Sequence, residues 1–157
     1  MKLKRHLQDV AQTAITTGVL NALINGVINW LLVKDKTELF LTTDSITSKD
    51  STVLGGAVIL ATSLAIILTS IGYFRFKSEN KPPYFPRGFM LTLKNAFFTF
   101  GVITSMSILL QRYAGSIAVN PISSAMIVAA IAGLVAGIIE YLTIKELLIN
   151  HYNSSKK

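Results

Sequence analysis

Three asparagines, Asn21, Asn25 and Asn29, recur at every fourth position within an apolar stretch of the chain. On a helix, this spacing places the three amides on one narrow arc, together with Gly18. A side-chain amide that faces hydrocarbon leaves its donors and acceptor unpaired, at a cost of several kcal/mol per group, so the arc must face other helices or water. The pattern predicts either hydrogen bonds between helices or a polar cavity that Asn95 also lines.

Glu140 is the only acidic residue inside an apolar stretch of membrane-spanning length. Carboxylates within membranes are candidates for function because their ionised form is costly in hydrocarbon. Glu140 also lies near the end of its stretch, five residues before Lys145, where its side chain could reach water among the lipid headgroups. An interfacial Glu140 would be structural, whereas a buried Glu140 would be a candidate for solute binding or proton coupling.

Few residues support catalysis or metal binding. The chain has no cysteine, which excludes disulfides and thiolate chemistry, and His6 and His151 lie near opposite ends of the sequence. No apolar stretch holds a pair of carboxylates, and the sequence contains no glycine-rich phosphate-binding loop. We therefore expect neither an enzyme nor a cofactor. Asp35, Asp44 and Asp50 share one loop, and a membrane enzyme built on them would be excluded only by their dispersal in space.

The elements that hold these residues are predicted to be membrane-spanning helices. Of the 157 residues, 51% are hydrophobic and 15% are charged, and the mean hydropathy is +0.52. Soluble domains carry about 25% charged residues. Four apolar stretches, residues 10–33, 53–74, 89–110 and 122–142, are each long enough to cross a bilayer as a helix. The sequence predicts a single all-α membrane domain of four helices in contact with the lipid bilayer.

Small residues indicate which helix faces meet. In the fourth stretch, Gly133 and Gly137 form a GxxxG pair on the same face as Glu140. Such a pair lets a second helix backbone approach closely. Gly18 and Gly55 lie on the small-residue faces of the first and second stretches. These faces predict a four-helix bundle, and they would serve equally in a homodimer or in contact with another membrane protein.

Basic residues are distributed unevenly between the loops, and the formal net charge is +7. Most of them precede the first stretch, separate the second from the third, or follow the fourth: Lys2, Lys4, Arg5, Arg75, Lys77, Lys81, Arg87, Lys145, Lys156 and Lys157. Loops rich in lysine and arginine stay on the cytoplasmic side of a membrane. Both termini are therefore predicted to be cytoplasmic, and the charge requires no nucleic-acid partner.

The loops carry shorter signals. Residues 50–51, Asp and Ser, are predicted to cap the second helix, and Asn120 followed by Pro121 is predicted to begin the fourth. The segment ELFLTT, residues 38–43, is interpreted either as a short strand or as a segment on the membrane surface. The segment SENKPPYFPRG, residues 78–88, contains three prolines and is predicted to be extended and non-helical.

Short motifs in the first half of the chain form a set: Asn21-Ala22, Ile24-Asn25-Gly26, Trp30, Asp44-Ser45-Ile46 and the basic, proline-containing middle loop. This set resembles a group of small bacterial four-span membrane proteins of uncharacterised function that are often labelled permeases. The resemblance implies a bacterial cytoplasmic membrane protein and, by its label alone, transport. It implies no substrate and no binding residue.

The asparagine arc motivates the functional hypothesis. We predict a small transporter-like or channel-like protein whose interior site for a small solute is lined by Asn21, Asn25, Asn29 and Asn95, with Glu140 as a further candidate. The alternative is a non-transporting scaffold or subunit that binds another membrane protein through its small and polar helix faces.

Overall fold

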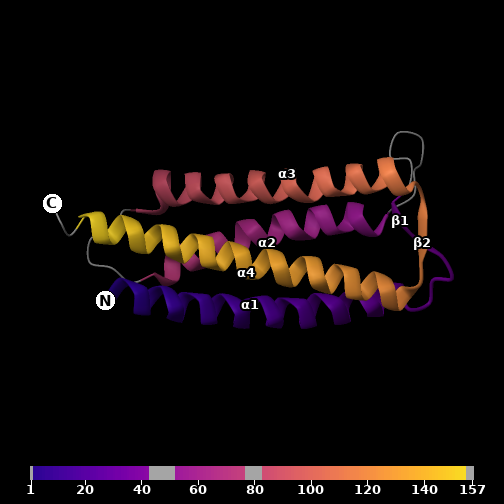
Figure 1. The fold of residues 1–157 in the computed structure, drawn as a ribbon, viewed down its shortest axis with the longest axis horizontal. Coiled ribbons are helices and arrows are strands. Elements are labelled where there is room, and N and C mark those ends of the chain that lie inside the picture. Colours follow the sequence, from indigo (N-terminus) through magenta and orange to yellow (C-terminus); the bar gives the residue numbers. More distant parts are fainter. Residues whose placement is uncertain (1, 43–51, 77–82, 155–157) are drawn as a thin grey trace.

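The computed structural model describes residues 2–42, 52–76 and 83–154 of the 157-residue chain. In chain order, the elements are helix α1 (Lys2–Val33), strand β1 (Leu39–Thr42), helix α2 (Val53–Arg75), the π-helical turn η1 (Tyr84–Gly88), helix α3 (Phe89–Ala114), strand β2 (Ile117–Val119) and helix α4 (Pro121–Ser154). Figure 1 shows the four long helices running alongside one another.

Each of the four long helices contains a segment that is long and apolar enough to cross a membrane. The predicted all-α class with four transmembrane helices is therefore confirmed. The helices extend beyond the predicted spans, most of all α4, which continues to Ser154 instead of ending at residue 142. Its last turns carry Lys145 and Glu146. A hydropathy pattern ends the predicted span before these charged residues. The helix itself can continue, because long charged side chains are tolerated where a helix leaves the hydrocarbon region of the membrane.

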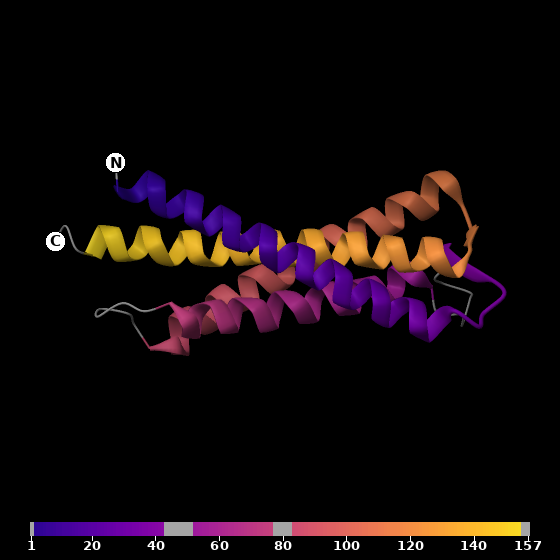
Figure 2. The same cartoon turned by 90° about the horizontal axis from the view of Figure 1, so that it is seen from below.

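The helices pack in the spatial order α1, α4, α2, α3 rather than in sequence order (Figures 1 and 2). α1 packs against α4, α4 packs against α2, and α2 packs against α3. Much of the apolar surface of α1 is exposed, including Leu23 and Leu31, and in a membrane this surface contacts lipid. The start of α1 and the end of α4 lie together at one end of the bundle, which we call the terminal end.

Strands β1 and β2 pair in antiparallel orientation at the opposite end, which we call the strand end (Figure 1). The pairing register shifts between Phe40 and Thr42. The hydroxyl of Thr42 donates a 2.8 Å hydrogen bond to the carbonyl oxygen of Gly115, just before β2. Of the two interpretations of residues 38–43, the short strand is confirmed for Leu39–Thr42. The sequence does not predict β2, because three residues are too few for a strand pattern.

The starts of α2 and α4 are held by polar side chains. Asn120 caps α4 as predicted, since its Oδ1 accepts a 2.7 Å hydrogen bond from the Ser123 amide. Thr52 caps α2, since its hydroxyl accepts a 3.0 Å hydrogen bond from the Gly55 amide. Residues 50–51, the predicted cap of α2, lie outside the described residues.

The turn η1 leads into α3 and departs only in part from the prediction for residues 78–88. Pro83 and Phe85 have extended backbone, as predicted, whereas Tyr84–Gly88 as a whole form a kinked turn with helical hydrogen bonds. Residues 78–82 lie outside the described part of the structure. The Tyr84 ring stacks on Phe74 with 5.0 Å between centroids, and the Tyr84 and Ser70 hydroxyls are 3.0 Å apart. These contacts fix the turn against α2, and the extended backbone of Phe85 follows the usual preference of a residue before proline.

Two buried apolar clusters hold the helices together. One lies at the strand end and joins the strand β1 to the helices through Val33, Leu39, Leu41, Val53, Leu54 and Val128. The other joins α2 to α4 through Ala61, Ala65, Val135 and Ile139. Because the α2 side of this second cluster is alanine, the backbones of α2 and α4 can come close together.

Candidate functional site

Helix α1 docks on α4 through small residues. Gly18 lies so close to α4 that a Cβ atom built on it would be 2.8 Å from the carbonyl oxygen of Gly133. A Cβ on Gly133 would be 2.8 Å from the Cβ of Ala22, and a Cβ on Gly137 would be 3.2 Å from the carbonyl oxygen of Ala14. We call this contact the α1–α4 seam. At these positions any side chain larger than hydrogen would separate the two helices.

Sequence reasoning missed one glycine of the seam and misplaced another. Gly26 also lies on the seam, because a Cβ on it would be 2.9 Å from the Cβ of Ala129. The available signal was a four-residue repeat of small residues in α1: Ala14, Gly18, Ala22 and Gly26. Gly55, expected at a helix contact, is instead exposed, and its closest neighbour is the hydroxyl of the capping residue Thr52. The buried face of α2 instead carries Ala57, Ala61, Ala65, Thr69 and Gly72.

The asparagine arc lies beside the seam, and its three residues are half-buried. Nδ2 of Asn21 donates to the Thr17 carbonyl, and Nδ2 of Asn25 donates to the Asn21 carbonyl, both at 2.9 Å and both within α1. In the described part of the chain, Asn29 alone of the three bonds to another helix, accepting a 3.1 Å hydrogen bond from the Ser124 hydroxyl of α4. These contacts leave Oδ1 of Asn25 and Nδ2 of Asn29 without a partner among the described residues.

Asn25 and Asn29 line a cavity of about 330 Å³, which we call the strand-end cavity. Its walls come from α1, α2, α4 and the chain near β1: Asn25, Ile28, Asn29, Leu32, Val33, Lys36, Leu39, Thr52, Val53, Gly56, Ala57, Leu60, Ser124 and Val128. Asn21 is not among them. Lys36 is the only charged residue in the set. Apolar walls with a few polar groups, at this volume, are typical of sites for small molecules.

Asn95 lies apart from the asparagine arc. Its Nδ2 donates to the hydroxyls of Thr69 (3.0 Å) and Thr143 (3.2 Å), so this amide joins α3 to α2 and α4. All three residues are buried. The prediction that Asn95 shares a cavity with the arc is wrong, because α4 and α2 lie between the polar faces of α1 and α3. Asn95 belongs to a separate buried polar cluster.

Of the two predictions for Glu140, interfacial or buried, the structure shows a buried side chain, with only 6% of its surface exposed. The side chain is covered by α2. Its Oε2 would be 3.8 Å from a Cβ atom built on Gly72 of α2. The positively charged side chain of Arg75, also in α2, interacts electrostatically with the Glu140 carboxylate. No described residue donates a hydrogen bond to its carboxylate. Glu140 does not line the strand-end cavity.

The described residues contain no group of three or more histidine, aspartate or glutamate side chains that could hold a metal ion. Of the loop acids considered as a catalytic group, Asp35 is exposed just after α1. Asp44 and Asp50 lie outside the described residues. The strand-end cavity is thus the best candidate for a site in the described chain.

No protein-family model, no curated protein and no solved structure matches this chain. Any function must therefore be inferred from the geometry of the cavity and its surroundings.

Proposed function

We propose that this membrane protein is a small carrier that binds amphipathic organic anions in the strand-end cavity. The observation that carries the proposal is the pairing of Asn25 Oδ1 and Asn29 Nδ2, both without a partner among the described residues, on the wall of one cavity. Neither atom is buried, so a ligand in the cavity can reach both and form hydrogen bonds with them.

The chemical class of the solute follows from the cavity walls. Lys36 contributes the only positive charge, and no wall residue is acidic, which favours a ligand with one negative group. The amides of Asn25 and Asn29 supply a donor and an acceptor for a further polar atom. The other walls are mainly Leu, Val and Ile, which favour a short hydrocarbon portion.

We further propose that the protein resides in a bacterial cytoplasmic membrane with both termini in the cytoplasm. The basic residues near the chain ends and in the loop between α2 and α3 support this orientation. The strand-end cavity then lies toward the outer surface, where a carrier first meets its solute. A reporter that is active only outside the cytoplasm should be silent when fused after Lys157 and active when inserted near Thr43. The reverse pattern would overturn the orientation.

Binding can be tested on the purified protein with a matched set of probes. Straight-chain carboxylates from acetate to hexanoate, each compared with its neutral amide, should raise the thermal unfolding temperature only as the anion. One hydrogen bond contributes a net of about 0.5–1.5 kcal/mol, so Asn29→Leu should weaken binding by roughly twofold to tenfold. Lys36→Gln should remove the preference for the anion over the amide.

Asn21→Leu is the matched control, because Asn21 has the same residue type on the same helix but lies off the cavity wall. It should leave binding unchanged. Equal effects of Asn21→Leu and Asn29→Leu, or equal stabilisation by anions and amides, would refute the solute site. Passage across the membrane is tested separately in vesicles: the carboxylate that binds should enter those containing the native protein, and Asn25→Leu should slow its entry while the protein still assembles.

A second candidate function is that of a subunit that binds another membrane protein on α3. Toward the strand end, α3 exposes Ser105 among large apolar residues, and Thr104 has a buried hydroxyl oxygen with no hydrogen-bond partner in the described structure. Polar groups at membrane depth favour contact with protein over lipid. Ser105→Leu should then release a co-purifying partner while Asn25→Leu does not. If Asn25→Leu releases the partner instead, the asparagine arc is an interface and not a solute site.

A further inference from the structure

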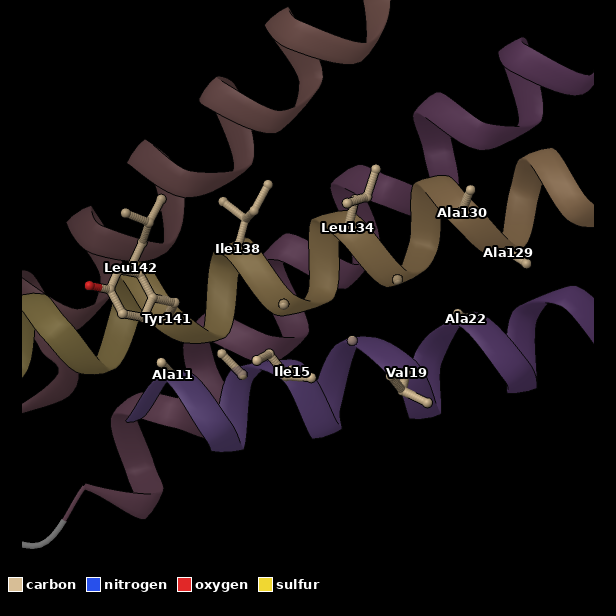
Figure 3. A pocket seen from close by; sticks show the side chains of 14 residues that line it. Ala11, Ile15, Val19, Ala22, Ala129, Ala130, Leu134, Ile138, Tyr141 and Leu142 are labelled. Atoms are coloured by element: carbon tan, nitrogen blue, oxygen red, sulfur yellow. The ribbon is translucent and has the colours of Figure 1, made fainter. Parts of the chain in front are cut away.

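A groove of about 510 Å³ runs along one side of the α1–α4 seam (Figure 3). Its floor is the glycine and alanine surface of the seam, and larger side chains such as Ile15, Val19 and Ile138 stand along it. We call it the seam groove. Its lining is almost entirely carbon, and Tyr141 supplies the one hydroxyl. The seam groove and the strand-end cavity share no lining residue.

The seam groove covers the depth of one lipid leaflet. Along α1 it extends from Ala11 to Ala22, which corresponds to about 16 Å of helix rise. This is close to half of the ~30 Å hydrocarbon core of a bilayer. Ala22 lies near the middle of the membrane-spanning part of α1, and Ala11 lies toward the terminal end. The groove therefore runs from the bilayer centre to the surface at the terminal end.

A positive charge stands at the surface end of the seam groove. Lys145 follows Tyr141 by one helical turn, and its Nζ lies 5.6 Å from the centroid of the Tyr141 ring. No described acidic side chain forms an ion pair with Lys145. The neighbouring acid, Glu146, is instead paired with Lys94. An apolar groove thus ends at an unneutralised ammonium group, at the depth where lipid headgroups lie.

The dimensions of the seam groove favour a hydrocarbon chain over a partner helix. Its volume of about 510 Å³ extends over about 16 Å of helix rise as a narrow, open channel. A helix is about 10 Å across with its side chains, so it could place only side chains in this channel. One extended acyl chain is far narrower and can follow a groove whose walls offer only dispersion contacts and apolar surface.

We propose that the seam groove binds one acyl chain of an anionic phospholipid from the leaflet at the terminal end, with Lys145 beside the lipid phosphate. Charge complementarity at Lys145 selects the headgroup, and the carbon-lined groove holds the chain. Anionic lipids are concentrated in the cytoplasmic leaflet, which matches the orientation inferred from the basic loops. The lipid site does not depend on the proposed solute site, because the two sites lie on different surfaces.

Native mass spectrometry of the full chain in neutral detergent tests this proposal. The probes are dioleoyl-phosphatidylglycerol and dioleoyl-phosphatidylcholine, which share acyl chains and differ in headgroup charge. The native protein should retain one phosphatidylglycerol in preference to phosphatidylcholine. A lysine near the membrane surface contributes roughly a fivefold preference for an anionic lipid, so Lys145→Gln should lower the preference by about that factor. Lys145→Arg should retain it. Lys34→Gln, a change at an exposed lysine near the strand end, is the matched charge control and should change nothing.

A second variant tests the groove itself. Ala130 lines the seam groove and is exposed, so Ala130→Phe should obstruct the groove without entering the seam and should weaken retention of both lipids. Met106→Phe, on the lipid-facing side of α3, is the matched control for added bulk and should have no effect. Circular dichroism of each variant checks that it remains folded.

Four outcomes of the lipid and variant experiments would overturn the proposal, and a fifth comes from a competition experiment. The first four are equal retention of the two lipids by the native protein, an unchanged preference in Lys145→Gln, unchanged retention in folded Ala130→Phe, and a dimer that Ala130→Phe dissociates, which would assign the groove to a second copy. Glycerol phosphate at millimolar concentration should not replace the lipid. If it displaced phosphatidylglycerol, the site would recognise the headgroup alone and the acyl-chain assignment would be wrong.

Discussion

The close approach of α1 and α4 predicts opposite effects for one substitution at two glycines. Gly18 faces the Gly133 carbonyl oxygen, and a new Cβ at 2.8 Å would be 0.6 Å inside the 3.4 Å lower limit of ordinary contact. The neighbour is backbone, so the two helices must move apart. Gly101 in α3 has no heavy atom within 4 Å of the corresponding position. Gly18→Ala and Gly101→Ala therefore add the same methyl group to a crowded position and to an open one.

The expected free energies follow from two opposing terms. Replacing glycine by alanine within a helix stabilises it by about 1 kcal/mol through backbone entropy. Forcing a methyl group into a packed contact costs about 1–3 kcal/mol. Gly101→Ala should therefore stabilise the protein by up to about 1 kcal/mol, whereas Gly18→Ala should be neutral or destabilise it by up to about 2 kcal/mol. The difference between the two variants should be about 1–3 kcal/mol.

Reversible unfolding in mixed micelles, followed by circular dichroism, measures both free energies under the same conditions. Subtracting the two variants cancels the backbone term and leaves the steric term of the seam. If Gly18→Ala proves as stabilising as Gly101→Ala, the two backbones are not in contact and the packing of α1 on α4 is wrong.

Three further predictions test the packing of other elements. Gly26→Ala should be neutral or destabilising in the same unfolding assay, because a Cβ at position 26 would lie 2.9 Å from that of Ala129, and a stabilisation equal to that of Gly101→Ala would contradict the pairing. Asn95→Ala should destabilise the fold by about 1–3 kcal/mol in the same unfolding assay, because it removes two buried hydrogen bonds, whereas the exposed Lys94→Ala should cost less than about 1 kcal/mol. Glu140→Met should leave the free energy of unfolding unchanged or raise it, because the buried carboxylate forms no hydrogen bond with described residues. A decrease of more than about 2 kcal/mol would assign Glu140 a structural role.

The membrane-spanning helices follow from the sequence because the bilayer leaves an apolar segment few choices. A segment of about 20 apolar residues must satisfy its backbone groups internally, and a helix does so without any partner. The hydrogen bonds of Asn21 and Asn25 are equally local. Each amide reaches the carbonyl four residues earlier, so the spacing in the sequence contains the information.

The partners of each helix could not be predicted in the same way. Small-residue faces occur on α1, α2 and α4, and composition alone does not determine which two meet. Asn95 illustrates the difficulty, because it bonds to Thr69 and Thr143, which precede it by 26 residues and follow it by 48. The sequence therefore identified Asn95 as a polar residue in a span but assigned it to the wrong neighbours.

The pairing of the first helix with the last has a consequence for how the chain enters a membrane. α1 is synthesised before its packing partner α4, so α1 lacks the contacts of the seam until α4 has also been inserted. Asn21 and Asn25 form hydrogen bonds within α1 and can form them before α4 is inserted. Asn29 can bond to Ser124 only after α4 has been inserted. A chain that stops before Pro121 would therefore leave the small-residue face of α1 without its partner, and the insertion of α4 is the event that forms the α1–α4 seam.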